Sequence, residues 1–452
     1  MSLTWQINVK TAAEADLVRL RCCCYERNYF LLFKFQIFRS LATQAQSGVN
    51  KMTPQTRTVA CLGLAQTLAW ASSYYLPAML ANSMARDLGV SSPMIFAAFS
   101  AALVVSALLG PLAGRAIDRY GGRRVLMLNS LVFALGLVCL AMAQGPVGLF
   151  AGWCILGIAM AAGLYESAFA TLVHLYGQRA RGPITGITLM AGLASTIGWP
   201  LSAWLELHWG WRTACMSWAG LHLLVALPLN ALLQKTPDAT ANEDIPPADG
   251  SASALATAAK PMSQSSARRA AALLALVFAV TWFISTAMAA HLPRLLQAQG
   301  LPLATALLLA ALVGPAQVAG RLLEYGLLRR VHPVVSARVA GALHSVGAIG
   351  FLLLGVPAGA AFTLLHGAGN GILTIAKGTL PLVLFGTKDY GLRQGLLMVP
   401  ARFAQALSPY LFGLAIDRYG GGALWFSAAL GGVCFMALML LPGPSPRAPA
   451  SP

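Results

Sequence analysis

Residues 110–124 read GPLAGRAIDRYGGRR, and a related stretch, AGRLLEYGLLRR, occupies residues 319–330. The two stretches align at a constant offset of 206, which places Glu324 at the position of Asp118. Each follows an apolar run of roughly 20 residues, the length that a helix needs to cross the hydrocarbon core of a bilayer. A turn that recurs in this way indicates that one helical unit occurs twice in the chain.

The composition indicates a polytopic helical membrane protein. Of the 452 residues, 57% are hydrophobic and 10% are charged, and the mean hydropathy is +0.68, whereas soluble domains are about 25% charged. A helix satisfies its own backbone hydrogen bonds within lipid, so the fold class is all-α. Apolar runs separated by short polar turns predict twelve spans, at residues 58–84, 93–114, 124–144, 148–172, 184–206, 212–233, 270–292, 302–326, 334–355, 358–385, 392–416 and 422–441.

A second correspondence supports the internal repeat. Tyr176-Gly177, Gly186 and Pro200 match Phe385-Gly386, Gly395 and Pro409 at an offset of 209. Two anchors predict two pseudo-symmetric six-helix bundles, the arrangement with which secondary transporters build a site at the midplane. The predicted segments are the bundles 52–233 and 270–442, the cytoplasmic linker 234–269 and the cytoplasmic tail 443–452.

Residues 1–51 differ in character from the spans. We interpret them as a poorly structured N-terminal extension, with Met52 as a possible working start. The run Cys22-Cys23-Cys24 leaves a second interpretation open, a palmitoylated or metal-binding cluster.

The charge distribution reports membrane orientation. The net charge of +17, from 31 Lys and Arg against 14 Asp and Glu, would suggest nucleic acid in a soluble chain. Nineteen basic residues instead fall in the tails and connections of one side, and the other side keeps Arg86, Arg212, Arg294 and Arg418. The positive-inside rule therefore predicts a multi-pass protein of the cell (inner) membrane with both termini cytoplasmic, and no nucleic-acid partner.

The stretch Gly110 to Arg124 resembles the signature G-x-x-x-G-x-x-x-D-R-x-G-x-R-[KR] between spans two and three of the major facilitator superfamily. Gly210-Trp211-Arg212, which opens span six, resembles another frequent feature of that superfamily. The resemblance implies a secondary transporter that works by alternating access, acts as a monomer in the bilayer and lines its cavity with spans 1, 4, 7 and 10. Basic residues within spans and a Gly-x8-Gly approach to span eleven are similar to monocarboxylate and oxalate/formate type members.

The signature residues are the predicted gate. Gly110 and Gly114 share one helix face and let a neighbouring helix approach closely, while Asp118 can reach Arg123 or the positive end of a neighbouring helix. The resemblance implies a cytoplasmic latch; the alternative is a surface loop whose arginines only anchor topology. In the second copy Leu327-Leu328 replace the glycines. The predicted gating residues are Gly110, Gly114, Asp118, Arg119, Arg123, Arg124, Arg321 and Glu324.

Among the ionisable residues within apolar spans, three stand out: Glu166 in span four, Lys377 in span ten and Arg402 in span eleven. Such residues are costly in lipid and normally face a partner or water. Two cations against one acid suit a small organic anion, and Arg402 can hold a carboxylate bidentately. Alternatively, Arg402 bonds carbonyl groups near Pro400 or Pro409.

The repeat also relates Glu166 to Lys377. An offset of 209 places Lys377 at the position of Ala168, so both side chains are expected at similar depth. One hypothesis is an ion pair between the halves that closes the cytoplasmic gate; the alternative is that each residue pairs locally.

Polar and aromatic residues on the cavity spans complete the predicted site. Span ten carries a stripe of His366, Asn370, Thr374 and Lys377 at i, i+4, i+8 and i+11. Aromatic residues on spans one, four and seven serve binding or packing equally well. Glu166 and His366 are the proton-coupling candidates, and either also suits a structural role. The substrate-binding candidates are Arg402, Lys377, Asn370, His366, Tyr165, Gln66, Trp70, Tyr74 and Trp282.

These features favour proton-coupled transport of a small organic anion of the monocarboxylate kind. The sequence contains neither a GxxxxGK[ST] loop nor a nucleophile elbow, so ATP-driven transport and enzyme activity are not expected. No cofactor and no metal site are predicted. The alternative is an efflux pump that exchanges a drug, metabolite or toxic oxyanion for protons, although residues 198–203 match the G-P-x-x-G-G element of such antiporters incompletely. A non-transporting receptor or scaffold is the remote alternative.

Overall fold

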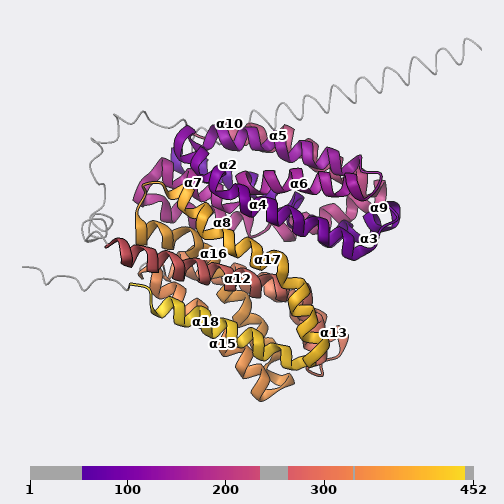
Figure 1. Ribbon diagram of the computed structural model, residues 1–452, viewed down its shortest axis with the longest axis vertical. Helices are drawn as coiled ribbons and strands as arrows, with labels where there is room; N and C mark the ends of the chain where they lie inside the picture. The colour runs from indigo at the N-terminus through magenta and orange to yellow at the C-terminus, as the bar shows by residue number, and fades with distance from the viewer. Residues whose placement is uncertain (1–52, 235–262, 329–330, 443–452) are drawn as a thin grey trace, which may run out of the picture. The chain divides into compact units, whose positions relative to one another are not determined.

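The computed structural model describes residues 53–234, 263–328 and 331–442 (Figure 1). The predicted extension 1–51 and tail 443–452 lie outside the described residues, as does most of the predicted linker 234–269. Contacts divide the chain into Met1–Arg57 and Thr58–Pro452. The side chains that form the site described below all belong to the second unit.

The predicted spans fall on helices, and several spans are interrupted. Span 58–84 breaks after Ser72, span 148–172 breaks at Leu164, and span 184–206 breaks after Ala191. In the N-terminal part the helices are α2 (Pro54–Ser72), α3 (Leu76–Asp87), α4 (Ser92–Tyr120), α5 (Gly122–Ala141), α6 (Pro146–Gly163), α7 (Tyr165–Tyr176), η1 (Gly177–Ala180), α8 (Arg181–Ala191), α9 (Ala194–Leu221), the π-helical turn η2 (His222–Ala226) and α10 (Leu227–Ala231).

The C-terminal part continues the pattern after the undescribed connection. Its helices are α12 (Gln264–Ala298), α13 (Leu303–Ala311), α14 (Val313–Gly326), α15 (Pro333–Leu354), η5 (Val356–Ala358), α16 (Gly359–Phe385), α17 (Tyr390–Tyr419), η6 (Gly420–Gly422) and α18 (Ala423–Met439). Among the described residues, eight helical stretches are long and apolar enough to cross a membrane. Two of them, Pro146–Ala231 and Tyr390–Met439, each contain more than one predicted span, so the chain is an all-α polytopic membrane protein.

The turn between α4 and α5 depends on the backbone conformation of one glycine. Gly121 stands between α4 and α5 with φ +77°, a conformation that glycine adopts without the steric cost of a Cβ. This single residue ends α4 and starts α5. Leu108, Leu112 and Leu128 on the same two helices are exposed, as lipid-facing side chains of a membrane protein are.

The two parts of the chain meet through a few helices. α4 packs against α17, and α8 packs against both α14 and α16. α12 runs beside α17 and α18 (Figure 1). α7 contacts α4, α16 and α17, which places the acid of span four among the C-terminal helices.

Candidate substrate and gating site

A buried ion pair joins the two parts of the chain. Nη2 of Arg402 on α17 donates a hydrogen bond to Oε2 of Glu166 on α7 at 3.0 Å. The side chains are 3% and 14% exposed, respectively, and Nη1 of Arg402 also donates to Oε1 of Gln405 at 3.0 Å. A charged pair held this far from water needs its hydrogen bonds satisfied, and these contacts supply them.

A break in span four presents Glu166. Residue Leu164, between α6 and α7, has extended backbone angles, and Glu166 falls in the first turn of α7. Nε2 of Gln66 donates to the carbonyl oxygen of Gly163 at 2.6 Å, and Nδ2 of Asn129 donates to that of Ala159 at 3.0 Å. The bond from Gln66 satisfies a carbonyl group that the interrupted helix leaves without its usual partner, and the bond from Asn129 adds a second contact to the last turn of α6. Gln66, a predicted substrate ligand, therefore holds the backbone beside the acid.

Lys377 lies on an indole instead of forming an ion pair with Glu166. Its Nζ is 4.0 Å from the ring centroid of Trp282, and Cζ of Arg402 is 5.4 Å from the same ring. Glu166 and Lys377 interact electrostatically, but the recorded ion-pair partner of Glu166 is Arg402. Two cations share one aromatic ring, whose face attracts positive charge.

Aromatic rings surround these cations. Trp70 and Trp282 are stacked with centroids 6.1 Å apart and an interplanar angle of 7°. Tyr165 and Tyr74 lie 4.9 and 5.3 Å from Trp70, and the hydroxyl of Tyr74 is 3.4 Å from that of Thr286. Within the described residues, the indole N–H groups of both tryptophans are buried without a hydrogen-bond partner. Two donors beside two cations suit an electron-rich ligand.

The remaining residues of the predicted stripe point elsewhere. Nδ2 of Asn370 donates to Ser285 on α12 at 3.0 Å. His366 is hydrogen-bonded to His344 on α15 and is not brought to the Glu166–Arg402 pair. The substrate-binding roles predicted for these residues remain predictions.

Asp118 caps the neighbouring helix. Its two carboxylate oxygens accept hydrogen bonds from the backbone N–H groups of Gly391 and Leu392, at 2.9 and 2.8 Å. These are orphan donors at the start of α17, where negative charge is favoured. Of the two targets expected for Asp118, the structure therefore shows the positive end of a helix and not Arg123.

Four glycines form the crossing of α4 and α17. The backbones of Gly110 and Gly114 pack directly on those of Gly395 and Gly391. A Cβ on Gly395 would lie 2.6 Å from the carbonyl oxygen of Gly110, and one on Gly391 would collide with the carbonyl oxygen of Gly114. The helices approach this closely only because both contribute small residues.

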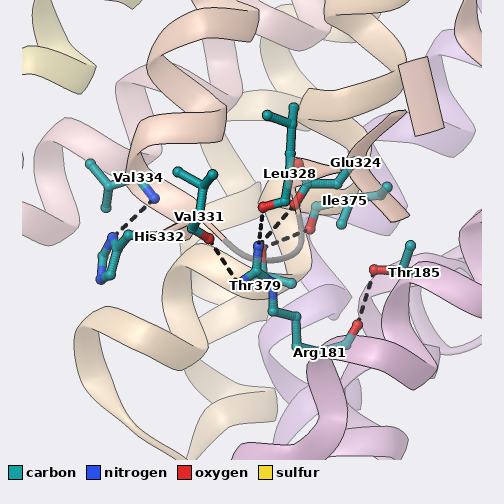
Figure 2. Close-up of polar contacts among 9 residues, drawn as sticks. All are labelled: Arg181, Thr185, Glu324, Leu328, Val331, His332, Val334, Ile375 and Thr379. Carbon is teal, nitrogen blue, oxygen red and sulfur yellow. Dashed lines mark hydrogen bonds and ion pairs between the residues drawn. The ribbon is translucent and has the colours of Figure 1, made fainter. Parts of the chain in front are cut away.

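In the second copy of the turn, the corresponding contact is made by the side chain of Arg181 (Figure 2). Nη2 of Arg181, at the start of α8, donates to Oε1 of the buried Glu324 on α14 at 3.1 Å. The guanidinium also donates to the carbonyl oxygens of Val331 at 3.1 Å and Leu328 at 3.3 Å. The residue equivalent to Leu392 is Pro183, at the offset of 209, and proline has no N–H to donate. The two copies thus use a backbone cap and an ion pair at corresponding helix starts.

The other predicted gating arginines lie in different surroundings. Arg119 and Arg124 are exposed, Arg123 is half-buried, and the guanidinium of Arg119 covers the ring of Tyr120 at 5.2 Å. Arg321 is only 5% exposed. Its one recorded hydrogen bond goes to Gln317 at 3.5 Å, and its Nε and Nη1 have no partner among the described residues. Arg321 is therefore a third buried cation without a carboxylate of its own.

A cavity connects the ion pair to the glycine crossing. Glu166 and Arg402 line it together with Gly110 and Gly395. Any separation of α4 from α17 therefore changes the surroundings of the pair directly. Among the described residues, no group of three or more His, Cys, Asp or Glu side chains is placed to hold a metal ion.

Sequence reasoning missed two residues of this region. His344 is a histidine inside the predicted span 334–355, which is the same signal that singled out His366. Arg181 stands at a helix start at the cytoplasmic end of span five, where a basic residue is ordinary. Only the fold shows that its partner is Glu324, 143 residues away.

Comparison with known proteins identifies the family of this chain. The family model of the Major Facilitator Superfamily matches residues 62–365. The chain is 33% identical over 156 residues to an uncharacterized 38 kDa protein in the 23S RNA operon of Thermoproteus tenax, and 30% identical over 150 residues to a gallate transporter of Pseudomonas putida. These matches cover 34% and 33% of this chain, and they span only 40% and 33% of the two relatives.

Solved structures share the fold. The human organic anion transporter MFSD10 superposes with a TM-score of 0.62 at 19% identity, over 86% of this chain and 100% of that chain. FucP, a superfamily transporter in the outward conformation, gives a TM-score of 0.65 at 15% identity over the same shares. With the family model matching most of the chain, the protein belongs to the Major Facilitator Superfamily, a family of transporters and not of enzymes.

Proposed function

We propose that the protein is a secondary active transporter of the cell (inner) membrane that moves a small organic anion by alternating access, coupled to protons. The observation that carries this proposal is the buried pair of Arg402 with Glu166 beside Lys377 and Arg321. Arg402 and Lys377 share the ring of Trp282. Glu166 pairs with only one of them, and Arg321 is a third buried cation without a carboxylate of its own among the described residues. Buried charges are costly unless they are paired. An anion from solution supplies the missing negative charge.

Exchange of carboxylates on Arg402 provides a coupling mechanism. The substrate carboxylate takes the place of Glu166 on the guanidinium, with which it can form two parallel hydrogen bonds. The displaced Glu166 then loses the guanidinium that paired it and lies beside the substrate carboxylate, whose like charge favours binding of a proton by Glu166. Substrate and proton therefore bind together and cross together.

The surrounding rings favour an aromatic carboxylate within this class. Trp282 carries both cations on its face and stacks on Trp70, with Tyr165 beside them. A planar acid can place its carboxylate on Arg402 and its ring among these aromatic side chains. The similarity to a protein named as a gallate transporter supports this choice.

Alternating access would use the two closures on the side predicted to be cytoplasmic. Asp118 on the start of α17 and Arg181 on Glu324 both tie the N-terminal to the C-terminal helices. Their release would open the cavity that borders Glu166 and Arg402. In this proposal both termini are cytoplasmic and the functional unit is a monomer.

Uptake into proteoliposomes tests the proposal. With a pH gradient, acid outside, the purified full chain is offered benzoate, lactate, arsenate and the hydrophobic cation tetraphenylphosphonium. Benzoate uptake is expected, and Arg402→Gln should weaken it about 10- to 100-fold, the value of lost charge-assisted hydrogen bonds. The exposed Arg86 supplies the control Arg86→Gln, which should transport like wild type. Transport of the hydrophobic cation alone, unaffected by Arg402→Gln, would overturn the proposal.

A further inference from the structure

Two histidine side chains face each other between two helices of the C-terminal part. Nδ1 of His344 on α15 lies 2.9 Å from Nδ1 of His366 on α16, and Nε2 of His344 lies 2.7 Å from the hydroxyl oxygen of Ser427 on α18. The imidazoles are only 7% and 3% exposed. Ionisable groups at this depth in a membrane protein are costly and usually functional.

The contact requires a defined proton arrangement. Two Nδ1 atoms at hydrogen-bond distance need one donor and one acceptor, so the two rings must be in different tautomers. When His366 donates through Nδ1, Nε2–H of His344 donates to Ser427 and Nε2 of His366 is a free base. Within the described residues, that Nε2 has no hydrogen-bond partner, so it can accept a proton.

A cavity lies beside this pair. Both imidazoles line it, and so do Asn370 and Ser285, which are hydrogen-bonded to each other. Asn370 is one helical turn from His366 along α16, and Ser285 lies three residues from Trp282 on α12. The cavity thus borders α16, which carries Lys377, and α12, which carries Trp282.

The neighbours of the pair are polar but not acidic. Thr281 and Cys434 line the same cavity and contact each other at 3.8 Å. No carboxylate of the described residues contacts either imidazole, so the positive charge of a bound proton would be stabilised by the hydrogen bond to the second ring and not by an ion pair. The charged residues on the helices that pack against α15 and α16, apart from exposed arginines at helix ends, are Arg338, Lys377, Arg321, Glu324, Arg181, Glu166, Arg393, Arg402 and Asp417.

Close packing fixes the geometry of the pair. α18 approaches α15 at Gly431, where an added Cβ would lie 3.1 Å from Cδ2 of His344 and would collide with the hydroxyl of Ser345. Ser345 itself donates to the carbonyl oxygen of Ala428 at 3.1 Å. The ring of His344 is therefore held between Ser427 and His366.

We propose that His344 and His366 together form a proton-binding site, separate from Glu166, that takes part in coupling. A proton adds to Nε2 of His366. The resulting imidazolium keeps its Nδ1–H on Nδ1 of His344, whose Nε2–H stays on Ser427, so one proton is gained and both existing hydrogen bonds are kept. Only the role in coupling rests on the proposed transport function.

Solid-state NMR of the full chain in lipid bilayers, with ¹⁵N-labelled histidine, tests the proton site without a substrate. Between pH 9 and pH 4 the imidazole nitrogens of His344 and His366 should change together, with uptake of one proton per pair. His344→Gln and His366→Gln assign the signals, and each should alter the titration of the remaining partner. Imidazoles that stay neutral over this range, or that titrate independently, overturn the proposal.

Transport tests the role in coupling. His344→Gln and His366→Gln should lose at least tenfold of benzoate accumulation driven by a pH gradient, while benzoate exchange without a gradient persists. The matched control is His222→Gln, another buried histidine bonded to a serine, Ser72, at 2.8 Å, and it should keep both activities. Wild-type accumulation in the two test variants overturns the coupling role. A wild-type chain that transports none of the probes contradicts the proposed function instead, and the NMR titration still decides the proton site.

Discussion

Arg402 and Glu166 are 236 residues apart in the chain, yet Nη2 of the arginine lies 3.0 Å from Oε2 of the glutamate. The contact ties α17 to α7 and uses the acid that a substrate anion would have to replace. In the proposed transport cycle, this one bond would therefore link three events: binding of the anion, release of the acid and movement of the helices.

Glu166→Gln should separate binding from coupling. The amide can still accept a hydrogen bond from Arg402, but it cannot bind a proton as a carboxylate does. We expect accumulation of benzoate against its gradient to fall at least tenfold, while benzoate exchange between the two sides is retained. Both are measured in proteoliposomes with radiolabelled benzoate. Glu206→Gln, at a half-buried carboxylate bonded to Ser83, should leave both unchanged. Full accumulation by Glu166→Gln would show that this acid is not the coupling group.

Gly391→Ala should open the crossing of α4 and α17. The new methyl group collides with the backbone of Gly114, and overpacking of this kind costs about 1–3 kcal/mol. The closed state should lose population roughly five- to hundredfold. Electron–electron distance measurements between spin labels at the exposed Tyr120 and Lys388, after replacement of the native cysteines, should show a longer distance. Gly432→Ala, where an added Cβ meets nothing within 4 Å, is the control. An unchanged distance distribution in Gly391→Ala would contradict the crossing.

Arg181 and Glu324 should be energetically coupled. Their bond involves a buried carboxylate, so a double-mutant cycle with Arg181→Gln and Glu324→Gln should give a coupling of about 1–3 kcal/mol in denaturation experiments. The exposed pair Arg294 and Asp417 is the matched control, and its coupling should remain below about 1 kcal/mol. Equal coupling in the two pairs would mean that the Arg181 contact is an ordinary surface bridge.

His332 should make stability depend on pH. Burial, with the guanidinium groups of Arg181 and Arg338, lowers the pKa of His332 below its usual 6.5. Its neutral Nδ1 accepts the N–H of Val334 at the start of α15. As the pH falls below 6.5 the unfolded chain takes up a proton that the folded chain resists, so stability decreases toward the folded-state pKa.

The test of this pH dependence is His332→Asn, because asparagine caps a helix without titrating. Melting temperatures between pH 7.5 and pH 5.5 should fall less for His332→Asn than for wild type. Parallel curves would show that His332 does not carry the effect.

The sequence was sufficient to predict the helical fold, because runs of apolar residues leave no other spanning structure in lipid. It did not predict the interruptions after Ser72 and at Leu164, since the few polar residues there, Ser72-Ser73 and Glu166-Ser167, do not end the apolar runs around them. The break at Leu164 depends on Gln66 and Asn129, which come from other helices. Contacts of that kind leave no periodic signal in the segment that they interrupt.

The three buried ionisable residues can be singled out from the sequence, but their contact partners cannot. Glu166, Lys377 and Arg402 were recognised because ionisable groups are rare in apolar spans. The repeat offset set Glu166 opposite Lys377, whereas the ion pair forms with Arg402 and Lys377 lies on Trp282. An offset fixes depth along a helix but not rotation about its axis, and rotation decides which of two nearby cations meets the acid.

The interruption at Leu164 gives the site a positive field that belongs to no side chain. The first amide groups of α7, at Tyr165 and Glu166, begin a helix in the interior, and such an end carries about half a positive elementary charge. Neutralising Lys377 and Arg402 together would leave this contribution in place, because it comes from the path of the main chain. The proposed preference for anions would therefore be partly built into the backbone, and the side chains around it would be free to vary in deciding which anion is accepted.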